Sequence, residues 1–528
     1  MLRSRVQVPP APLCDRRVAR WFVEDCSILA IVTDYLRSFE IAPSDISGLA
    51  SKVAKGSYDK YLRRVVLHKV RGFVDREVTF DFPVTALVGP NGGGKTTILG
   101  AAALAYKAVA PGRFFAKSGR YDSSMRSWSI EHAVIDKSLD TRLEIRRTVG
   151  FQTSKWNRKP FNRDVLVFGV TRTVPASERS DLKKAIGGSF IAANEAVLPE
   201  VVAVEAERIL GKSIVGYSEL DVDASGRATL YAATDKASGN RYSEFHFGAG
   251  EASVIKIVSG IEQAPNNSLI LIEEIENGLH PVATRRLVEY LIAVAKRKSC
   301  QVIFTSHSSA ALEPLPSEAI WAAFNGEIVQ GSLNIEALRT ITGRIEAELA
   351  IFVEDEFAEL MVGTALRYAG ADLRAIKVHG MGGHDPAVKV NVQHNNDPTR
   401  TFVSVALVDG DQPELADDAR KIYVLPGDTY PEAHVFDTVL SELDTVVARL
   451  TLGLNLPVTD QSRVKSVIEQ RASTNRDRHI IYEQIGADLD FTAELVVRNA
   501  FLAQWAQVKP DEVQAMFEPF RDNIPFHP

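Results

Sequence analysis

Cysteine is scarce in this sequence, and long apolar runs are absent. The three cysteines among 528 residues are Cys14, Cys26 and Cys300. They are too few and too scattered for a disulfide framework or a cysteine metal cluster, so a reducing cytoplasm fits best. No uninterrupted apolar stretch approaches the roughly 20 residues that a membrane-spanning helix needs. We therefore expect a cytoplasmic protein without a membrane partner.

A strong excess of one charge is also lacking. The sequence has 61 Lys and Arg against 67 Asp and Glu, a formal net charge of -6. Contact with nucleic acid would therefore have to come from a local patch. Residues 113–184 carry 16 Lys and Arg against 8 Asp and Glu. This excess is typical of a nucleic-acid groove and equally of a solvated face on a surface lobe.

What is present is the composition of a globular protein with several domains. Hydrophobic residues make up 45% of the chain and charged residues 24%. The length leaves room for about two to four domains. Strand-like apolar runs alternate with helical patterns, which predicts the α/β class.

A complete phosphate-binding motif lies in the first fifth of the chain. Residues 89–96, GPNGGGKT, match G-x-x-x-x-G-K-[ST], follow a predicted strand at 85–88 and precede a predicted helix at 97–108. In this context backbone N–H groups wrap the phosphates of ATP, Lys95 reaches the β and γ phosphates, and Thr96 binds Mg²⁺. The residues that we predict to bind ATP here are Gly89, Pro90, Asn91, Gly92, Gly93, Gly94, Lys95, Thr96 and Thr97.

Two acidic residues end an apolar strand much later in the chain. In SLILIEEIENGLHP, residues 268–281, Glu273 is placed to hold the water shell of Mg²⁺ and Glu274 to polarise the attacking water. Solvated acids at a strand end are the alternative, but the complete P-loop favours the catalytic interpretation. His307 ends the next apolar strand, QVIFTSH, and is a candidate sensor of the γ phosphate.

These motifs together resemble the ABC-type ATPase heads of the RecF, SMC and OLD (overcoming lysogenization defect) proteins. In that family a signature loop precedes the strand with the two acids, and HFGAGEASV, residues 246–254, occupies this place. Gly248 stands where the family usually has serine, and Glu273 replaces the commoner aspartate. The family uses this loop in trans, so the resemblance implies that Gly248, Gly250 and Glu251 bind ATP across the interface between two heads, in a homodimer or a higher homo-oligomer.

The motif order divides the chain into four parts. Residues 1–60 form a leader and a helical segment, and residues 61–335 form the head, with an inserted lobe at 110–245. The lobe shows no sustained heptad pattern, which argues against a long coiled coil of the SMC kind. Residues 345–440 form a second α/β domain, and residues 441–528 a helical region. The leader has no continuous apolar core, so we expect a disordered start or an artefact of the chosen start codon rather than a signal peptide.

A second cluster of acids is predicted in the second α/β domain. Glu354 follows an apolar strand at 350–353, and Asp409 and Asp411 follow another at 403–408. Because the carboxyl ends of parallel strands meet at one edge of a sheet, these side chains are expected to lie together. Mg²⁺, or alternatively Mn²⁺, would neutralise them, since hard cations prefer oxygen ligands. A surface turn is the competing interpretation of the D-x-D sequence.

The order of strand, acid, helix, strand and D-x-D resembles the TOPRIM (topoisomerase–primase) domain that OLD-family proteins carry after their head. The resemblance implies that the three acids are catalytic and bind metal, and it adds Glu432 as a further metal ligand. Asp355 stands where the family usually has glycine, and Ala358 where it has a second acid, for which Glu356 or Glu359 could substitute.

The sequence thus resembles the OLD-type ATPase–TOPRIM proteins over residues 61–440. The resemblance implies an ATP-binding head that dimerises and controls a metal-dependent endonuclease acting on nucleic acid, on DNA rather than RNA. Proteins of this kind often act in antiphage defence, where a second protein can take part. The alternative is a RecF-like DNA-repair or sensor ATPase whose TOPRIM-like domain binds without cutting. A transporter subunit is disfavoured, because it has no use for a D-x-D domain.

Overall fold

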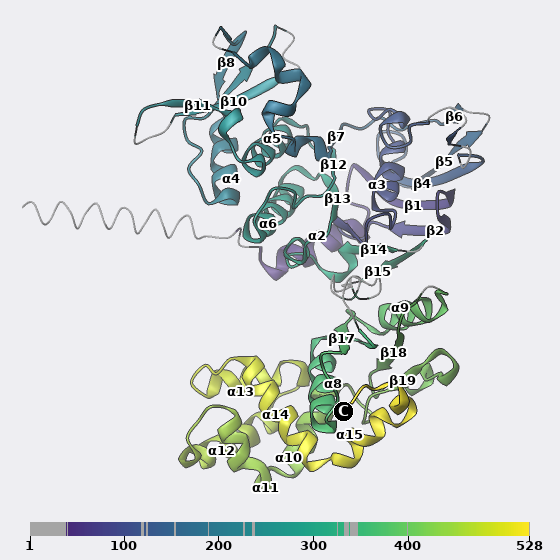
Figure 1. The fold of residues 1–528 in the computed structure, drawn as a ribbon, viewed down its shortest axis with the longest axis vertical. Helices are drawn as coiled ribbons and strands as arrows, with labels where there is room; N and C mark the ends of the chain where they lie inside the picture. The colour runs from purple at the N-terminus through teal and green to yellow at the C-terminus, as the bar shows by residue number, and fades with distance from the viewer. Residues whose placement is uncertain are drawn as a thin grey trace, which may run out of the picture.

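The computed structural model has two parts, which Figure 1 shows one above the other. The upper part ends with β15 (Glu327–Gln330), and the lower part begins with β16 (Leu349–Val353). The structure describes residues 39–526 apart from 40, 118–120, 123–124, 153–154, 188, 225–227, 235–237, 325, 332–336, 338–339, 341–346 and 399. The predicted leader therefore lies outside the described residues.

The upper part is organised around a six-stranded sheet of order β15-β14-β3-β13-β12-β7. All neighbours are parallel except β15, which pairs antiparallel with β14. The residues of β3, β12, β13 and β14 are all buried, as expected of parallel strands covered on both faces. The parallel strands are β3 (Val84–Val88), β7 (Val165–Phe168), β12 (Leu269–Ile272), β13 (Gln301–Ser306) and β14 (Ile320–Phe324).

Helix α3 (Lys95–Leu104) is enclosed between this sheet and an antiparallel sheet of order β2-β1-β4-β5-β6. Every residue of the helix except Thr96 is buried, and its apolar side chains share one core with both sheets. The helix has no polar face because no face of it meets solvent. The strands of the antiparallel sheet are β1 (Lys60–Val70), β2 (Phe73–Thr79), β4 (Trp128–Asp136), β5 (Ile145–Gln152) and β6 (Lys155–Asn157).

Helices cover the opposite face of the central sheet, and a small antiparallel sheet projects beyond them (Figure 1). The range 110–245, predicted as one inserted lobe, is divided in the structure. Its strands β4 to β6 complete the antiparallel sheet, β7 joins the central sheet, and β8 to β11 form the projection with a separate core. The elements are α2 (Pro43–Ala54), α4 (Glu200–Leu210), α5 (Ala249–Gln263), α6 (Pro281–Lys298), β8 (Asn194–Val197), β9 (Ser218–Asp221), β10 (Thr229–Thr234) and β11 (Arg241–Ser243).

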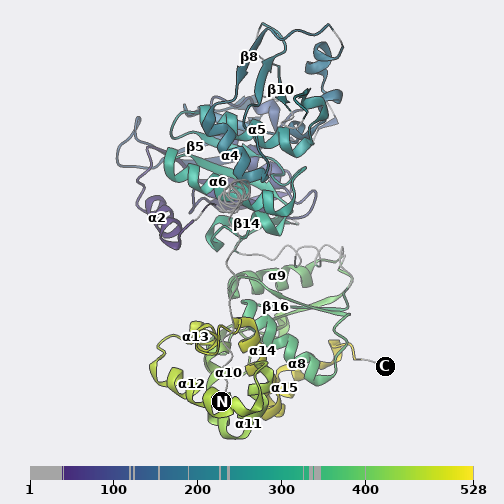
Figure 2. The same cartoon turned by 90° about the vertical axis from the view of Figure 1, so that its left-hand side faces the viewer.

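The lower part begins with a four-stranded parallel sheet of order β17-β16-β18-β19. The chain moves from β16 to one neighbour, β17, and then crosses back to the other, β18, so the strand order reverses between β16 and β18. In Figure 2 helix α9 lies on one side of this sheet and helix α8 on the other. The further elements are α8 (Glu356–Ala369), β17 (Ile376–Gly380), α9 (His384–Asn396), β18 (Val403–Val408) and β19 (Ile422–Val424).

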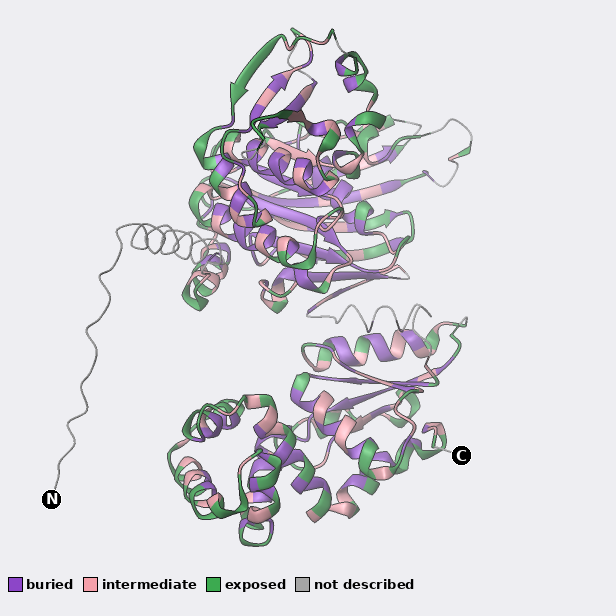
Figure 3. Ribbon diagram, turned by 60° about the vertical axis from the view of Figure 1, so that its left-hand side comes forward, coloured by how far each residue is buried: buried purple, intermediate pink, exposed green. Residues whose placement is uncertain are grey.

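The rest of the lower part is helical, as predicted. These helices share an apolar core with α8 and one face of the parallel sheet, and Figure 3 shows their buried sides turned toward one another. No helix in the described part of the chain has the length and apolar content needed to span a bilayer. The helices are α10 (Pro431–Ser441), α11 (Leu443–Gly453), α12 (Gln461–Thr474), α13 (Ile481–Asp488), α14 (Glu494–Val508) and α15 (Pro510–Phe517).

Candidate functional site

The P-loop connects the buried strand β3 to the start of α3, as its sequence predicts. A Cβ atom on Gly89 would lie 2.1 Å from the Ala323 carbonyl oxygen, and one on Gly93 would lie 2.4 Å from the same atom. Gly94 has a φ of 103° and caps the helix. Larger residues would therefore push the loop away from β14. The glycines set the loop path, which leaves backbone N–H groups at the N-terminus of α3, where anions bind.

Lys95 is the first residue of α3 and is 7% exposed. Its Nζ atom donates to the carbonyl oxygens of Gly89 (2.9 Å) and Pro90 (3.0 Å). The loop therefore curls around the ammonium group, which is held where the β and γ phosphates of ATP would lie. The loop opens onto a cavity of about 420 Å³ lined by Arg71, Gly72, Phe73, Asn91, Gly92, Gly93, Gly94, Lys95, Thr96, Thr97, Glu274, Thr305 and Gly326.

Thr96 and Thr97 differ in their surroundings. Thr96 is exposed at the cavity, which suits the Mg²⁺ ligand that the motif predicts. Thr97 is buried, and its Oγ1 accepts a hydrogen bond of 2.8 Å from Arg71. Arg71 was not predicted from the sequence. It lines the same cavity and offers a guanidinium group beside the phosphate loop.

The two acids after β12 lie next to the P-loop because β12, β13 and β3 are parallel neighbours. Glu274 lines the P-loop cavity, and its backbone N–H donates to Thr305 Oγ1 at 2.8 Å. Burial raises the pKa of Glu273 above its ordinary value, an effect that the nearby Arg113 guanidinium opposes. Glu274 thus lies at the P-loop cavity, whereas Glu273 is not among its lining residues, and the metal-binding and water-polarising roles stay predictions.

His307 directly follows β13, whose last residue, Ser306, is the register partner of Val88 at the end of β3. The histidine and the P-loop therefore leave adjacent strands at the same edge. Glu276 fixes this turn: its carboxylate accepts from the His307 N–H at 2.5 Å and from the Ser306 hydroxyl at 2.8 Å. The sequence did not reveal this role of Glu276.

The predicted signature loop forms the start of α5. Gly248 caps the helix, and a Cβ atom on Gly250 would lie 2.0 Å from the Gly278 carbonyl oxygen. Glu251 accepts hydrogen bonds from Lys212 (2.9 Å) and Tyr217 (2.8 Å). None of the three signature residues lines the P-loop cavity of the same chain. Use of this loop in trans stays a prediction.

The second candidate site lies at the carboxyl edge of the parallel sheet. Glu354 follows β16 and Asp409 follows β18, so the two residues flank the point where the strand order reverses. Open α/β sheets bind their ligands at such a point. The Asp409 N–H donates to Glu354 Oε1 at 3.0 Å, and the two residues are 8% and 9% exposed. Burial raises the pKa of Asp409 to about 8, and the charge of Glu354 adds to the effect.

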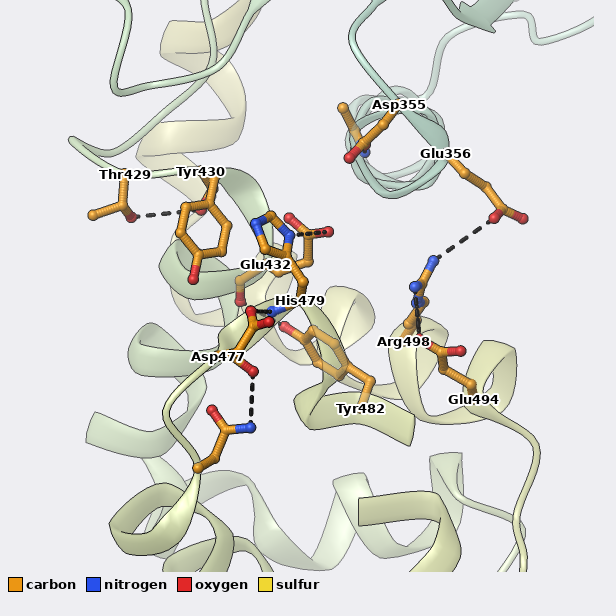
Figure 4. Close-up of polar contacts among 12 residues, drawn as sticks. Asp355, Glu356, Thr429, Tyr430, Glu432, Asp477, His479, Tyr482, Glu494 and Arg498 are labelled. Carbon is orange, nitrogen blue, oxygen red and sulfur yellow. Dashed lines mark hydrogen bonds and ion pairs between the residues drawn. The ribbon is translucent and has the colours of Figure 1, made fainter. Parts of the chain in front are cut away.

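Glu432 belongs to the same cluster. It lies in the first turn of α10, is 4% exposed, and has a raised pKa because of burial and the charge of Asp355. Its Oε1 atom lies 3.3 Å from His479 Nδ1, and the His479 ring is stacked on Tyr430 with centroids 4.2 Å apart (Figure 4). The fold of the C-terminal helical region thus brings His479 to the predicted acid Glu432.

The remaining acids around this edge have different surroundings. Asp411 is exposed on the turn that follows Asp409. Asp355 caps α8 through the Ala358 N–H, and its charge contributes to the raised pKa of Asp409. The two candidate substitutes for a second acid are engaged elsewhere, since Glu359 accepts from the Gly380 N–H at 2.8 Å and Glu356 pairs with Arg498 at 3.8 Å.

The chemistry of this cluster fits a hard divalent cation. Asp409 Oδ1 and Glu432 Oε2 are buried oxygens that have no hydrogen-bond partner in the described part of the protein. Such oxygens are costly to bury, and a cation would compensate them. Within the described residues, no three His, Cys, Asp or Glu side chains already converge as a complete metal site. A metal site at this edge of the sheet stays a prediction.

Two protein-family models match the upper part of the chain. Residues 156–313 match a family described as "AAA domain, putative AbiEii toxin, Type IV TA system", and residues 64–162 match a family described as "AAA domain". No curated protein matches the chain.

The solved structures that the chain matches are distant in sequence and have low TM-scores. The SMC head domain from Thermotoga maritima is 14% identical, covers 52% of this chain and 99% of its own, and has a TM-score of 0.33. The recombination mediator protein RecF with ATP is 12% identical. The match covers 52% of this chain and 99% of RecF, with a TM-score of 0.32. The C-terminal region of the Burkholderia pseudomallei OLD protein is 16% identical. The match covers 33% of this chain and 98% of that structure, with a TM-score of 0.22. The P-loop, Glu274 at its cavity and the two matched AAA-domain families together indicate a P-loop ATPase domain within residues 64–313.

Proposed function

We propose that this protein is an ATP-regulated, metal-dependent endonuclease that cuts nucleic acid, DNA in preference to RNA. The observation that carries the proposal is the pair Glu354 and Asp409 at the reversal point of the second sheet. Both side chains are buried, and Glu354 accepts a hydrogen bond of 3.0 Å from the Asp409 backbone N–H, so that without a cation two ionised carboxylates would repel each other here. A structural turn has no need of such a pair, whereas phosphodiester cleavage does.

In the head, the residues of the P-loop cavity bind ATP and Mg²⁺. Lys95 and the glycine N–H groups hold the phosphates. Thr96 would bind the Mg²⁺ ion through its hydroxyl oxygen, and Glu273 would bind the water shell of the ion. Glu274 accepts a proton from the attacking water, and His307 contacts the γ phosphate. Gly248, Gly250 and Glu251 complete the site of a second copy, so that two ATP molecules are enclosed by a homodimer.

At the second site, Glu354, Asp409, Asp411 and Glu432 hold the metal, which is Mg²⁺ or Mn²⁺. Bound there, the cation supplies a Lewis acid that lowers the pKa of water and stabilises the charge of the leaving oxygen. The protein orients the carboxylates through the Asp409 N–H, which fixes one oxygen of Glu354. His479, at 3.3 Å from Glu432, fixes the side chain of that acid.

Further parts of the proposal rest on the resemblance to OLD-type proteins. The biological role is antiphage defence in the cytoplasm, and a second protein of a defence system is a candidate partner. The family description of residues 156–313, which names a toxin of a Type IV TA system, supports a role of this kind.

A RecF-like ATPase whose second domain binds nucleic acid without cutting is the second candidate. The incomplete convergence of the acids within the described residues favours it. Incubation of plasmid DNA and RNA with Mg²⁺ or Mn²⁺, with and without ATP, separates the two candidates. If the protein is an endonuclease, cleavage should depend on the metal and change with ATP. If it is RecF-like, it should bind the nucleic acid and leave it uncut.

A further inference from the structure

A buried arginine binds the backbone of the two acids in the ATPase head. Arg172 follows β7 and is 8% exposed. Its Nη1 atom donates to the Glu273 carbonyl oxygen at 2.6 Å, and its Nη2 atom donates to the Glu274 carbonyl oxygen at 2.6 Å. One guanidinium group thus binds both peptide carbonyls of the acid pair, a geometry that a planar fork of donors can satisfy and a lysine cannot.

The backbone that Arg172 holds is unusual. Glu274 has a φ of 45°, in the left-handed region that residues with a side chain seldom adopt. Such a conformation persists only where neighbouring groups fix it, and it is common at functional sites. Here Thr305 accepts from the Glu274 N–H at 2.8 Å, and Arg172 binds its carbonyl. The backbone of Glu274, which lines the P-loop cavity, is therefore held on both sides, and Asn277 Nδ2 donates to its carboxylate at 2.7 Å.

The same arginine reaches the signature helix. Its Nε atom donates to the hydroxyl of Ser253 at 2.9 Å, and Ser253 lies in α5, five residues after Gly248. Ser253 is 1% exposed, so this contact is shielded from solvent. A shift of α5 would therefore be transmitted through one side chain to the Glu274 peptide.

We infer that Arg172 is a positioning residue for ATP hydrolysis, which couples the signature helix α5 to the backbone of Glu274. The inference rests on the ATPase activity of the head. Arg172 does not line the P-loop cavity, so its loss should slow hydrolysis without weakening ATP binding. A movement of α5 on dimerisation would reach the catalytic acid by this route.

The chain offers a matched control at the opposite end of the same strands. Arg163 precedes β7, is 4% exposed, and donates to the carbonyl oxygens of Asn267 (2.7 Å) and Ser268 (3.3 Å), just before β12. Both arginines are buried and clamp β7 to β12, but only Arg172 contacts the acid pair. Arg163→Lys and Arg172→Lys should therefore cost comparable stability and differ in catalysis.

The test measures turnover, ATP affinity and melting temperature for both variants of the full chain. Arg172→Lys should lose at least about tenfold in turnover, as misplaced catalytic groups do, with ATP affinity within about twofold of wild type. Arg163→Lys should keep its turnover per folded molecule. Ser253→Ala removes a single hydrogen bond and should lower turnover about threefold, and adding it to Arg172→Lys should cause no further loss, because coupled residues are not additive.

Three results would overturn the inference. The first is a turnover of Arg172→Lys equal to that of wild type, and the second is an equal loss in Arg163→Lys. The third is a double variant whose loss is the product of the single losses. A wild type that does not hydrolyse ATP overturns the ATPase assignment and this role together, whereas the three results above leave the ATPase assignment intact.

Discussion

Replacement of Asp409 by asparagine should stabilise the metal-free protein at alkaline pH. Asp409 is 8% exposed, and burial together with Glu354, Asp355 and Glu432 raises its pKa from 3.8 to about 8. Asparagine keeps the shape of the side chain. It also keeps the backbone N–H at position 409, which donates to Glu354 Oε1. The variant therefore removes the buried charge and leaves the surrounding hydrogen bond in place.

The sign and size of the effect follow from proton linkage. Because the folded state binds this proton more tightly than the unfolded state, the free energy of unfolding of wild type falls as pH rises from about 4 to about 8. The difference in pKa corresponds to about 6 kcal/mol when Asp409 is fully ionised in the fold. The neighbouring carboxylates share this repulsion and can move apart, so we expect a measurable gain of roughly 2 kcal/mol for Asp409→Asn.

Urea unfolding at about pH 5 and about pH 9, with EDTA and with Mg²⁺, measures this effect. The advantage of the variant over wild type should be smaller at the lower pH than at the higher pH. The variant should also gain less from Mg²⁺, because a ligand of the folded state stabilises only where it binds. Asp411→Asn, on the exposed part of the same turn, is the control and should change the metal-free stability little. Equal stability of wild type and Asp409→Asn at the higher pH, with no gain from Mg²⁺ in either, would refute the reasoning.

Three further predictions concern the head. Lys95→Ala should lose ATP binding or hydrolysis by at least about tenfold, because it removes the charge that faces the phosphates; unchanged affinity and turnover, by calorimetry and phosphate release, would remove the assignment. Glu274→Gln should bind ATP but hydrolyse it slowly, so light scattering should find more dimer with ATP than without it, and an unchanged mass would contradict the sandwich of two heads. Burial lowers the pKa of His132 from 6.5 to about 4. The unfolded state therefore takes up this proton first, and the free energy of unfolding should fall by up to about 3 kcal/mol as pH falls from 6.5 to 4. His132→Gln, which can still donate to the Ala101 carbonyl, should flatten that fall.

Local patterns in the sequence were sufficient to predict the structure where one motif determines both the backbone conformation and the chemistry. The P-loop requires glycine at Gly89 and Gly94, so strand, loop and helix were predictable together. The largely apolar run at 403–408 matches β18 in full, because a strand buried on both faces needs a mostly apolar sequence. Its one polar residue, Ser404, donates to Asn391 Oδ1 at 2.8 Å. The helix predicted at 97–108 runs from Lys95 to Leu104, because the chain then turns to pair Tyr106 with Phe161.

Contacts between distant segments could not be predicted. Arg172 is one of 61 basic residues, and only the packing of β7 against β12 brings it to the acid pair. His479 reaches Glu432 across 47 positions because α10 and the turn before α13 pack together. The division of the range 110–245 among three sheets likewise depends on long-range strand pairing, which leaves no local pattern.

The central claim is that ATP in the head controls cleavage at the acids of the second sheet. Its most direct measurement is plasmid cleavage with Mg²⁺ or Mn²⁺, with and without ATP, by wild type, Asp409→Asn and Lys95→Ala, with ATP hydrolysis followed in parallel. The account predicts that wild type cuts in a metal-dependent and ATP-responsive way. Asp409→Asn should hydrolyse ATP without cutting, and cleavage by Lys95→Ala should no longer respond to ATP. Cleavage by Asp409→Asn at the wild-type rate, or wild-type cleavage that is the same with and without ATP, would contradict it.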